Sequence, residues 1–376
     1  MKILHINCNY IGTALHQIML EHLDGLGVSS TVYVPTYSKE TSIIEPNEYV
    51  VVSECFKKMD RIWYGYKQKK IIKDIMNQIQ IDDFDLIHAY TLFTDGNCAM
   101  KISQKYDIPY VVAIRDTDIN TFLKYRPYLE SKAIEIMRNA SAVFFLSTAY
   151  KEVMFKKYIP QKYHESIGTK TYIIPNGIDD FWQENIFNGS ISDRINRVSN
   201  RTLKVVYAGR INKRKNLEIS QKAIQLLRDS GWKIQYTFTG KIENKQIFDR
   251  VMRYPDTEYL GVSNKEKLLA IYRNADLFLM PSYTETFGLV YAEALSQGLP
   301  VIYTKGQGFD GQFEEGTVGY RTSSNSAEEC ADAIEKIANN YDNISKNCVP
   351  CAEKFKWNLI CKRYMRVYFH ISAQCE

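Results

Sequence analysis

The chain of 376 residues lacks any apolar run of the length that a membrane-spanning helix needs, about 18 to 20 residues. Its start, MKILHINCNY, becomes polar too early for a secretory signal. We therefore expect a protein of the cytoplasm or of the inner face of the plasma membrane. Low-complexity tracts and short-period repeats are also absent. With 45% hydrophobic and 24% charged residues, the composition is that of a soluble globular protein and excludes intrinsic disorder.

A disulfide framework is missing as well. Eight cysteines are scattered along the chain, at positions 8, 55, 98, 330, 348, 351, 361 and 375, which predicts reduced thiols. Cys348 and Cys351 have the spacing of a zinc or redox pair, but no second pair of ligands matches them. Asp116-Thr-Asp118 has the spacing of a metal-binding acid pair without a convincing context. We expect neither a metal ion nor a cofactor.

Strong net charge is lacking too, since the formal total is only +5. The charge is nevertheless unevenly distributed. Residues 201–250 hold twelve Lys or Arg and four Asp or Glu, an excess of eight positive charges. Because the excess peaks in one short loop and no nucleic-acid-binding motif accompanies it, we do not expect a nucleic-acid partner.

Short β-branched or aromatic runs alternate with helical stretches, which predicts parallel sheets with crossover helices. The first series of runs lies at 2–7, 31–35, 85–88, 110–114, 142–146 and 172–174, and a second series at 204–207, 234–238, 277–280 and 301–303. A polar stretch without periodicity, about 180–201, separates the two series and reads as a linker. We predict an α/β fold with domains at 1–182 and 201–351 and a C-terminal segment at 352–376.

The segment from Pro281 to Pro300 carries the strongest chemical pattern. A predicted strand ends at Met280 and a helix begins near Gly288, so Glu285 lies in the loop at the carboxyl edge of the sheet, where open α/β sheets bind ligands. Glu293 lies inside the helix, within two turns of its start. The amides of Phe287, Gly288 and Leu289 occupy the helix N-terminus, which attracts anions. The alternative is that both acids are solvated surface residues.

A second pattern follows the strand that ends at Ala208. Gly209 allows a tight turn, and the cationic loop from Arg210 to Lys215 then opens a helix. Arg offers a fork for phosphate oxygens and Lys a point charge, so Arg210 and Lys215 suit a diphosphate. A basic solvated turn is the alternative.

These motifs, taken in order, resemble those of a known family. Glu285 and Glu293 are similar to the Glu-x7-Glu motif of retaining glycosyltransferases with the GT-B fold, and Gly209-Arg210…Lys215-Asn216 is similar to their diphosphate loop. Pro175-Asn176-Gly177-Ile178-Asp179 resembles the segment that ends their first domain. The chain is identified as a member of glycosyltransferase family 4. The resemblance implies two tandem Rossmann-like domains that face each other across a cleft, with the terminal helix packed back on the first domain.

The resemblance also implies roles for particular residues. Arg210 and Lys215 would bind the donor diphosphate, Glu293 the ribose, and Glu285 the hydroxyls of the donor sugar. The amides of Phe287, Gly288 and Leu289 would help to hold sugar and phosphate, Val262 would meet the base through its backbone, and Gly12 would close over the phosphate. The implied chemistry retains the anomeric configuration and usually needs no metal.

In the first half, the chain departs from the family pattern. Many members carry His-Gly after the strand at 111–114, where this chain has Arg115-Asp116-Thr117-Asp118. Some relatives have Arg-Gly-x-Asp there, so Asp118 keeps a predicted catalytic role. His88 matches a loop near the acceptor side and is a candidate for substrate binding, with a structural histidine as the alternative.

Seven cations at 57–73 interleave with Ile62, Trp63, Tyr64 and Tyr66, and resemble an interfacial helix that lies on anionic lipid. An exposed helix that covers the sheet is the alternative.

Together, these observations predict an enzyme that transfers a hexose or N-acetylhexosamine from a nucleotide-diphosphate sugar to a glycan or lipid-linked acceptor in bacterial capsule, exopolysaccharide or O-antigen synthesis. A UDP-sugar is the first choice of donor and GDP-mannose the second. The alternative function is a non-catalytic relative of the GT-B fold that binds a nucleotide sugar or serves as an assembly partner.

Overall fold

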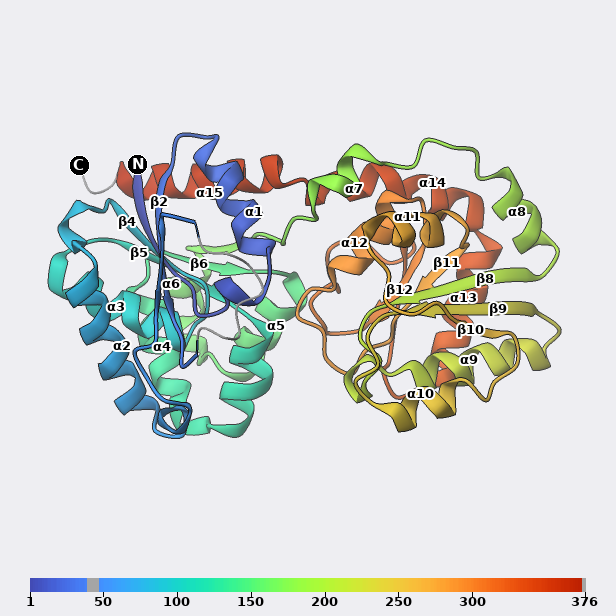
Figure 1. Ribbon diagram of the computed structural model, residues 1–376, viewed down its shortest axis with the longest axis horizontal. Coiled ribbons are helices and arrows are strands. Elements are labelled where there is room, and N and C mark those ends of the chain that lie inside the picture. The colour runs from blue at the N-terminus through green and yellow to red at the C-terminus, as the bar shows by residue number, and fades with distance from the viewer. Residues whose placement is uncertain (39–46, 374–376) are drawn as a thin grey trace. The chain divides into compact units, whose positions relative to one another are not determined.

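The computed structural model describes residues 1–38 and 47–373, drawn as a ribbon in Figure 1. The chain forms two compact units. Unit 1 consists of Met1–Leu146, Tyr150–Gly177 and the chain from Trp357 onward, and unit 2 consists of Ser147–Ala149 and Ile178–Lys356. Residues 374–376, the end of the predicted C-terminal segment with Cys375, lie outside the described residues.

Within the described residues, unit 1 contains a parallel sheet of seven strands in the order β3-β2-β1-β4-β5-β6-β7. The strands are β1 (Lys2–Ile6), β2 (Ser29–Pro35), β3 (Val50–Ser53), β4 (Leu86–Ala89), β5 (Tyr110–Ile114), β6 (Ala142–Phe145) and β7 (Thr171–Ile173). The central strands read as continuous apolar runs because helices cover both faces of the sheet. The chain order reverses between β1 and β4, and such a switch point opens a crevice at the carboxyl edge.

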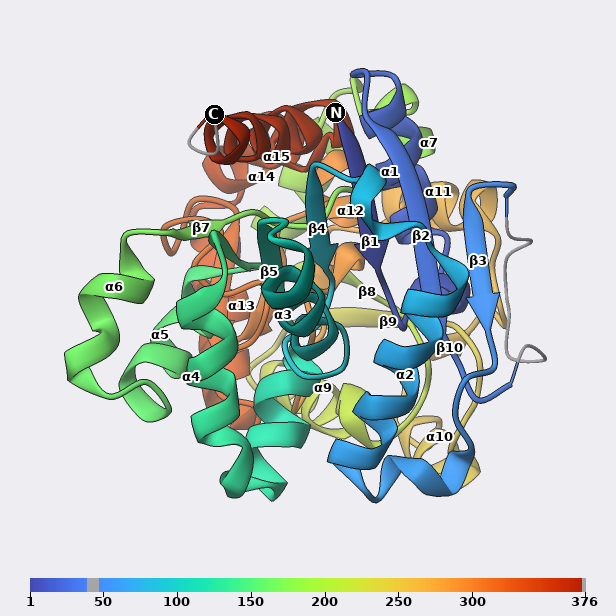
Figure 2. The ribbon, with the colours of Figure 1, turned by 90° about the vertical axis from the view of Figure 1, so that its left-hand side faces the viewer.

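The helices of unit 1 form a layer on each face of this sheet. They are α1 (Leu15–Asp24), α2 (Tyr64–Gln78), α3 (Thr94–Tyr106), α4 (Glu130–Asn139), α5 (Thr148–Lys157), α6 (His164–Gly168) and α15 (Trp357–Ser372). Buried residues of α2, α3 and α4 share one apolar cluster with the sheet, and those of α1 and α15 share another. Figure 2 shows α2, α3 and α4 in front of the strands. The terminal helix α15 is thus part of the core of unit 1, with Trp357, Tyr364 and Tyr368 buried.

Unit 2 repeats this plan with a parallel sheet that has six strands in the described part of the chain, in the order β10-β9-β8-β11-β12-β13. The strands are β8 (Thr202–Ala208), β9 (Lys233–Thr239), β10 (Thr257–Tyr259), β11 (Leu277–Leu279), β12 (Val301–Thr304) and β13 (Gly319–Thr322). Its helices are α7 (Asp180–Glu184), α8 (Ser192–Ser199), α9 (Leu217–Asp229), α10 (Lys245–Val251), α11 (Lys265–Arg273), α12 (Leu289–Ser296), α13 (Ala327–Asn339) and α14 (Tyr341–Ala352). Here the order reverses between β8 and β11.

The two tandem parallel-sheet α/β domains predicted from the sequence are confirmed. The strands that the sequence analysis did not predict, β3, β10 and β13, are short and lie at sheet edges. The structure also differs at 180–201, which reads as a linker in the sequence. Residues Ser192–Ser199 form α8, and the buried guanidinium of Arg194 donates hydrogen bonds to the carbonyls of Gln297 and Gly298, so this stretch belongs to unit 2. None of the helices in residues 1–38 and 47–373 has the length and apolar character needed to cross a membrane.

Candidate functional site

The loops after β8 and β11 meet at the switch point of unit 2. The two strands are neighbours in the sheet and run parallel, so the loops that follow them emerge side by side at its carboxyl edge. The first loop, 209–216, carries the cationic pattern, and the second, 280–288, carries Glu285. The sequence motifs are therefore brought together by topology.

The first loop has a backbone that only certain residues adopt. Gly209 has a φ of 151°, and a Cβ there would lie 2.8 Å from the Tyr207 hydroxyl. The Asn212 side chain accepts a hydrogen bond from the Lys215 amide at 3.1 Å and so closes a short 3₁₀ turn. Asn216 follows in the left-handed region with a φ of 59°. Its side-chain amide donates to the carbonyls of Pro281 and Ser324 at 2.9 and 2.7 Å, which ties the first loop to the second.

Lys215 and Glu285 form the centre of the site. The Lys215 ammonium donates a hydrogen bond to Oε2 of Glu285, although the side chains are only 10% and 8% exposed. The sulfur of Met280 lies 3.7 Å from the same nitrogen. A buried ion pair of this kind lies in a region of low dielectric, where charges act strongly on a charged ligand.

The backbone around Glu285 is held from both sides. Its amide donates to Oε1 of Gln307 at 2.9 Å, and its carbonyl accepts from the amide of Gly308 at 3.0 Å. Gly288 begins α12 with a φ of 77°, and a Cβ there would lie 2.5 Å from the Tyr291 ring. Phe287 is buried against Phe355, with the ring centroids 5.6 Å apart.

The first amides of α12, at Gly288 and Leu289, lack intrahelical partners and lie beside Glu285 in the same loop. Together with that of Phe287, they form the helix N-terminus at which the sequence predicts an anion.

Arg210 occupies the exposed rim of this site. Its guanidinium lies 3.2 Å from a carboxylate oxygen of Glu243, and Asn212 donates to the other oxygen at 2.8 Å. The hydrogen bond from Asn212 is the main cause that lowers the pKa of Glu243, and Arg210 adds to it. An exposed ion pair is weak, so Arg210 can exchange this partner for an anionic ligand at little cost.

Glu293 lies on α12, half-buried. Burial raises the pKa of its carboxyl to about 7, repulsion by Asp179 adds to the rise, and Lys265 opposes it. Carboxyls with perturbed pKa values cluster at functional sites, where burial and neighbouring charges tune them to a chemical task.

Val262 lies in the loop after β10, with 71% of its surface exposed. The preceding Gly261 has a φ of 76°, and its carbonyl accepts hydrogen bonds from the Thr239 hydroxyl at 2.7 Å and from the Gly240 amide at 2.9 Å. The backbone next to Val262 is thereby fixed at the carboxyl edge of the unit 2 sheet.

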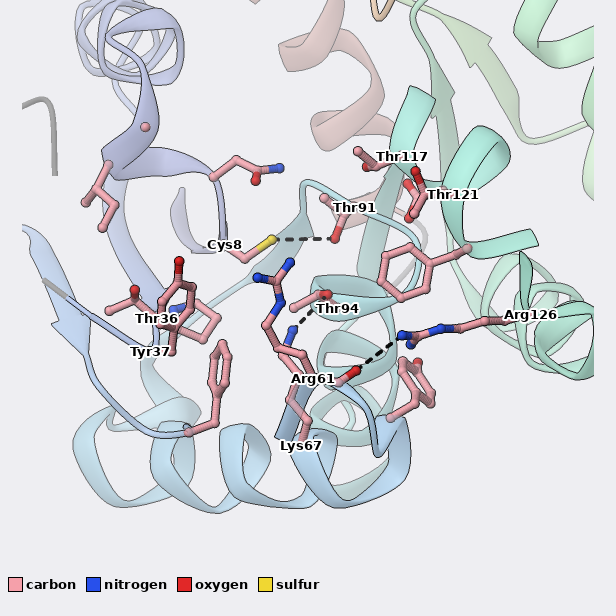
Figure 3. A pocket seen from close by; sticks show the side chains of 18 of the residues that line it. Cys8, Thr36, Tyr37, Arg61, Lys67, Thr91, Thr94, Thr117, Thr121 and Arg126 are labelled. Carbon is pink, nitrogen blue, oxygen red and sulfur yellow. Dashed lines mark hydrogen bonds between the residues drawn. The ribbon is translucent and has the colours of Figure 1, made fainter. Parts of the chain in front are cut away.

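Unit 1 has its own cavity, of about 590 Å³, at the carboxyl edge of its sheet. Loops after β1, β2, β4 and β5 and the start of α2 line it, and Figure 3 shows side chains from these segments pointing into it. Two of the predicted residues, Gly12 and Asp118, are among the lining residues. Gly12 does not have a positive φ, and a Cβ there would meet no atom within 4 Å, so the fold itself does not require glycine at this position.

The Asp118 carboxylate is almost fully buried. It accepts hydrogen bonds from the amides of Leu92, Phe93 and Arg115, at 3.0, 3.3 and 2.9 Å, which join the loops after β4 and β5. Burial raises its pKa to about 6, and the three amides oppose the rise. The carboxylate of Asp118 thus holds the backbone of the two loops together, and its catalytic role stays a prediction.

His88 lies inside the core of unit 1 rather than at its edge. It is part of β4, has no exposed surface and stacks on Tyr90 with a centroid distance of 4.2 Å. Its Nδ1 lies 2.7 Å from the hydroxyl of Tyr368 on α15. Burial holds the pKa of His88 well below its usual value, so the ring is neutral. This packing does not support the predicted contact with substrate and agrees with the structural alternative.

Several residues of the two sites went unnoticed in the sequence. Gln307 holds the Glu285 loop, and no sequence pattern indicated it. Asn216 belonged to the predicted diphosphate loop, but its hydrogen bonds to the second loop were not predicted. Arg61 and Lys67 line the cavity of unit 1, although the sequence placed them in a patch directed at lipid. Cys348 and Cys351 are free thiols on α14. Among residues 1–38 and 47–373, no three His, Cys, Asp or Glu side chains are grouped so as to hold a metal ion.

Two family models and several known proteins are similar to this chain. The family model described as Glycosyltransferase Family 4 matches residues 17–180, and the one described as Glycosyl transferases group 1 matches residues 191–355. Alpha-monoglucosyldiacylglycerol synthase of Acholeplasma laidlawii is 24% identical over 323 residues, which cover 80% of this chain and 78% of that protein.

Solved structures give the same fold. Sucrose-phosphate synthase from Thermosynechococcus elongatus has a TM-score of 0.74 at 17% identity, with 100% of both chains covered. Anabaena HepE in complex with UDP and glucose has a TM-score of 0.66 at 18% identity, covering 97% of this chain and 98% of that chain.

Two parallel-sheet α/β units of this topology give the chain the GT-B fold of its structural neighbours. Since the two family models match successive parts of the chain, the protein is a member of the glycosyltransferase family 4 type.

Proposed function

We propose that the protein is a retaining, metal-independent glycosyltransferase that moves a hexose or N-acetylhexosamine from a UDP-sugar to a glycan or lipid-linked acceptor. Its pathway would be the assembly of a bacterial capsule, exopolysaccharide or O-antigen at the inner face of the plasma membrane. The buried Lys215–Glu285 pair at the switch point of unit 2 carries the proposal. The Lys215 ammonium suits a phosphate and the Glu285 carboxylate suits sugar hydroxyls. Because the two groups are hydrogen-bonded to each other, they can contact both ends of a sugar–phosphate bond.

In this proposal, unit 2 binds the donor. Lys215 and Arg210 receive the diphosphate, with Lys215 buried beside the bond to be broken and Arg210 on the rim. The first amides of α12, from Phe287 to Leu289, add hydrogen-bond donors at the positive end of the helix. Glu285 accepts from hydroxyls of the donor sugar, and Glu293 from those of the ribose.

The remaining donor contacts come from backbone. The backbone beside Val262 meets the base, and Gly209 allows the chain to approach the phosphates closely. Uracil is the first choice of base because a structural neighbour, Anabaena HepE, is in complex with UDP and glucose. GDP-mannose is the second choice of donor.

The transfer itself would proceed by front-face attack. The bond between the anomeric carbon and the phosphate oxygen breaks, a bond to the acceptor oxygen forms on the same face, and the leaving phosphate takes the acceptor proton. No protein nucleophile is required. Lys215 and Arg210 offset the negative charge that builds on the diphosphate, which is the task that a divalent metal performs in other transferases.

The acceptor would bind to unit 1, whose cavity lies at the carboxyl edge of the sheet. A lipid-linked acceptor is favoured by the exposed apolar side chains of the basic segment 57–73, among which Trp63 is 70% exposed. The relative from Acholeplasma laidlawii is named as a synthase of a glycolipid, which supports the same class of acceptor.

The test of the proposal begins with the donor. The melting temperature of the full chain is measured with UDP, GDP, UDP-glucose, UDP-N-acetylglucosamine and GDP-mannose, since a ligand that binds only the folded state raises it. We expect UDP and one UDP-sugar to raise it. Turnover is then measured as release of UDP in the presence of candidate acceptors, and the anomeric configuration of the product is read by NMR.

Variants assign the activity to the site. Lys215→Met and Glu285→Gln remove transfer, whereas Lys222→Met, which changes an exposed lysine on α9, leaves it intact. Equal loss of activity in all three variants, an inverted product, or activity that requires added Mg²⁺ after treatment with a chelator would contradict the proposal.

A further inference from the structure

The cavity of unit 1 contains three cationic side chains that the donor chemistry does not use. Arg61 comes from the turn before α2, Lys67 from α2, and Arg126 from the segment after β5. In Figure 3, the Arg61 guanidinium and the Lys67 ammonium point into the cavity from one wall, and Arg126 approaches from the other. Arg126 donates to the Arg61 carbonyl at 3.3 Å, which joins the two walls.

Within residues 1–38 and 47–373, none of these three cations forms an ion pair. Their contacts are to neutral groups instead. Lys67 donates to the Thr94 hydroxyl at 3.4 Å and lies 4.6 Å from the Phe56 ring centroid. The Arg61 guanidinium lies 5.6 Å from the Tyr37 ring centroid. By contrast, the neighbouring Lys70 on α2 is paired with a carboxylate.

Two acids lie near the cavity, and hydrogen bonds hold both in the fold, although the charge of Lys67 still acts on Asp95 and opposes the rise of its pKa. Asp118 accepts from three backbone amides, as described above. Asp95 has no exposed surface, and it accepts from the Cys8 amide at 3.2 Å and from the Thr91 hydroxyl at 2.9 Å. Among the described residues that line the cavity, three cations therefore stand against one acid, Asp118.

The rest of the lining suits a sugar ring with a charged substituent. Threonines, among them Thr94 and Thr121, and aromatic rings, among them Tyr37 and Phe56, line the same space. Two forked guanidinium groups and an ammonium offer more donors than the two oxygens of a carboxylate can accept. A phosphate group has more negative charge and more terminal oxygens, so it matches this set of donors better.

We infer that the cavity of unit 1 binds the acceptor through a phosphate group held by Arg61, Lys67 and Arg126. The inference rests on the proposed function, in which unit 1 takes the acceptor, and adds the chemical class of that acceptor. The phosphate belongs either to a soluble sugar phosphate or to the headgroup of a lipid. Both sources share the same chemistry in the cavity and differ in what surrounds it.

The surroundings provide the means to separate the two sources. Arg61 is flanked in sequence by Met59, Ile62 and Trp63, which are exposed, and Arg126 lies between the exposed Tyr125 and Tyr128. A lipid headgroup would bring its chains to these apolar side chains, whereas a soluble sugar phosphate would not touch them.

Binding is measured by calorimetry on the full chain with excess UDP present, so that the donor site of unit 2 does not take up the probe. The probes are inorganic phosphate, glucose 6-phosphate and glucose. We expect glucose 6-phosphate to bind at least about tenfold more tightly than glucose, because hydrogen bonds from charged groups are lost with the phosphate. Arg61→Ala and Lys67→Ala each weaken this binding by about tenfold.

Lys69→Ala and Lys73→Ala are the matched controls, because both lysines lie exposed on α2 and neither lines the cavity. We expect them to bind glucose 6-phosphate as the unmodified chain does. Equal affinity for glucose and glucose 6-phosphate, or equal weakening by the α2 controls, overturns the inference.

The source of the phosphate is tested with vesicles of phosphatidylcholine, with and without phosphatidic acid. Binding that requires phosphatidic acid and is lost in both Arg61→Ala and Trp63→Ala identifies a lipid headgroup. Binding of glucose 6-phosphate that is unchanged in Trp63→Ala, without binding to either vesicle, identifies a soluble acceptor. Failure of every phosphate probe overturns the inference.

This outcome is distinguishable from failure of the proposed function. The rise of the melting temperature with UDP depends on Lys215 in unit 2, so it persists in Arg61→Ala. If UDP raises the melting temperature and no phosphate probe binds, the inference fails and the donor assignment stands. If the phosphate probes bind and no nucleotide does, the proposed function fails.

Discussion

Lys215 donates a hydrogen bond to Glu285, a residue 70 positions later in the chain, in the interior of unit 2. The sequence motifs assign the lysine to a phosphate and the glutamate to a sugar, whereas in the structure the two side chains bind each other. The pairing places two opposite charges in a buried region, where removal of either one leaves the other without its counterpart. A donor that binds there replaces an existing ion pair rather than filling a neutral pocket.

This pairing predicts a large and coupled effect on stability. Lys215→Met takes the cation away from a buried carboxylate and lowers the free energy of unfolding by about 3 kcal/mol, and Glu285→Gln has a comparable effect. The double variant loses less than the sum of the two, since no buried charge remains without its counterpart. Urea denaturation of the four proteins measures the coupling.

The control for this cycle is Lys346→Met, which breaks the exposed ion pair with Asp342 on α14. We expect its free energy of unfolding to remain near that of the unmodified chain. Additive effects of Lys215→Met and Glu285→Gln would show that the two side chains do not interact.

A second prediction concerns the backbone that holds Glu285. Gly288→Ala forces a side chain into a φ of 77° and to within 2.5 Å of the Tyr291 ring. We expect a loss of about 1 to 3 kcal/mol in the free energy of unfolding and a lower kcat/KM, because α12 and the Glu285 loop must move. Thermal unfolding and donor turnover measure the two effects.

Gly12→Ala serves as the comparison, since a Cβ at Gly12 meets no atom within 4 Å and the residue has no positive φ. Its stability should match that of the unmodified chain. A destabilisation equal to that of Gly288→Ala would mean that the loop after β1 is more constrained than the structure indicates.

The alternation of apolar runs and helices was sufficient to predict both sheets, because buried parallel strands are short continuous runs of β-branched and aromatic residues, whereas amphipathic helices are longer and have a period of about 3.6 residues. The short edge strands β10 and β13 were not predicted, because they have only three or four residues and little apolar content. In the candidate site, Glu285 and Lys215 were predicted together because each follows a strand, and parallel strands end at one edge. Their direct contact was not predictable, since it depends on side-chain direction in two loops.

His88 and the 57–73 segment show a different limit. His88 is the third residue of β4, and its contact with Tyr368 joins positions 280 residues apart, which no local pattern encodes. The cations of 57–73 appear equivalent in sequence, but Arg61 and Lys67 face the cavity of unit 1 while Lys69 and Lys73 are exposed on α2. The basic segment 57–73 looks like one surface in the sequence. In the structure, α2 and the turn before it direct its cations to different places.

A third prediction follows from the raised pKa of Glu293, about 7, which burial causes. The ionised carboxylate accepts hydrogen bonds from ribose hydroxyls, and protonation removes half of that capacity. We therefore expect the affinity for the donor to be constant above pH 8 and to fall by up to about tenfold per pH unit below 7. UDP-glucose is the suitable ligand, because the terminal phosphate of UDP itself titrates near pH 6.

In Glu293→Gln the dependence on pH should vanish, with an affinity that is lower at pH 8 and unchanged at pH 6. Glu266→Gln, which alters an exposed acid on α11, should keep the dependence of the unmodified chain. Calorimetric titrations at four pH values decide between these outcomes. A slope that survives in Glu293→Gln would assign the titration to another group.

A fourth prediction concerns His88, whose pKa burial holds well below the usual value, with nearby His5, Arg115 and His16 adding to the effect. In the unfolded chain a histidine takes up a proton near pH 6.5, and in the fold His88 does not. The contribution of the neutral His88 to the free energy of unfolding is therefore complete above pH 6.5. Below pH 6.5 it decreases by about 1.4 kcal/mol per pH unit.

His88→Phe removes the titration and also the hydrogen bond to Tyr368, so the variant is less stable by about 1 to 3 kcal/mol at pH 7.5. Below pH 6.5 the gap narrows by about 1.4 kcal/mol per pH unit. Tyr368→Phe loses the same hydrogen bond but keeps the imidazole, so its gap stays constant with pH. Buried carboxyls such as Asp95 titrate in the opposite sense, but they are common to all three proteins and cancel in the differences. Urea denaturation at several pH values between 5 and 7.5 measures the difference in free energy of unfolding between each variant and the unmodified chain. If this difference does not decrease for His88→Phe on acidification, His88 is protonated in the fold.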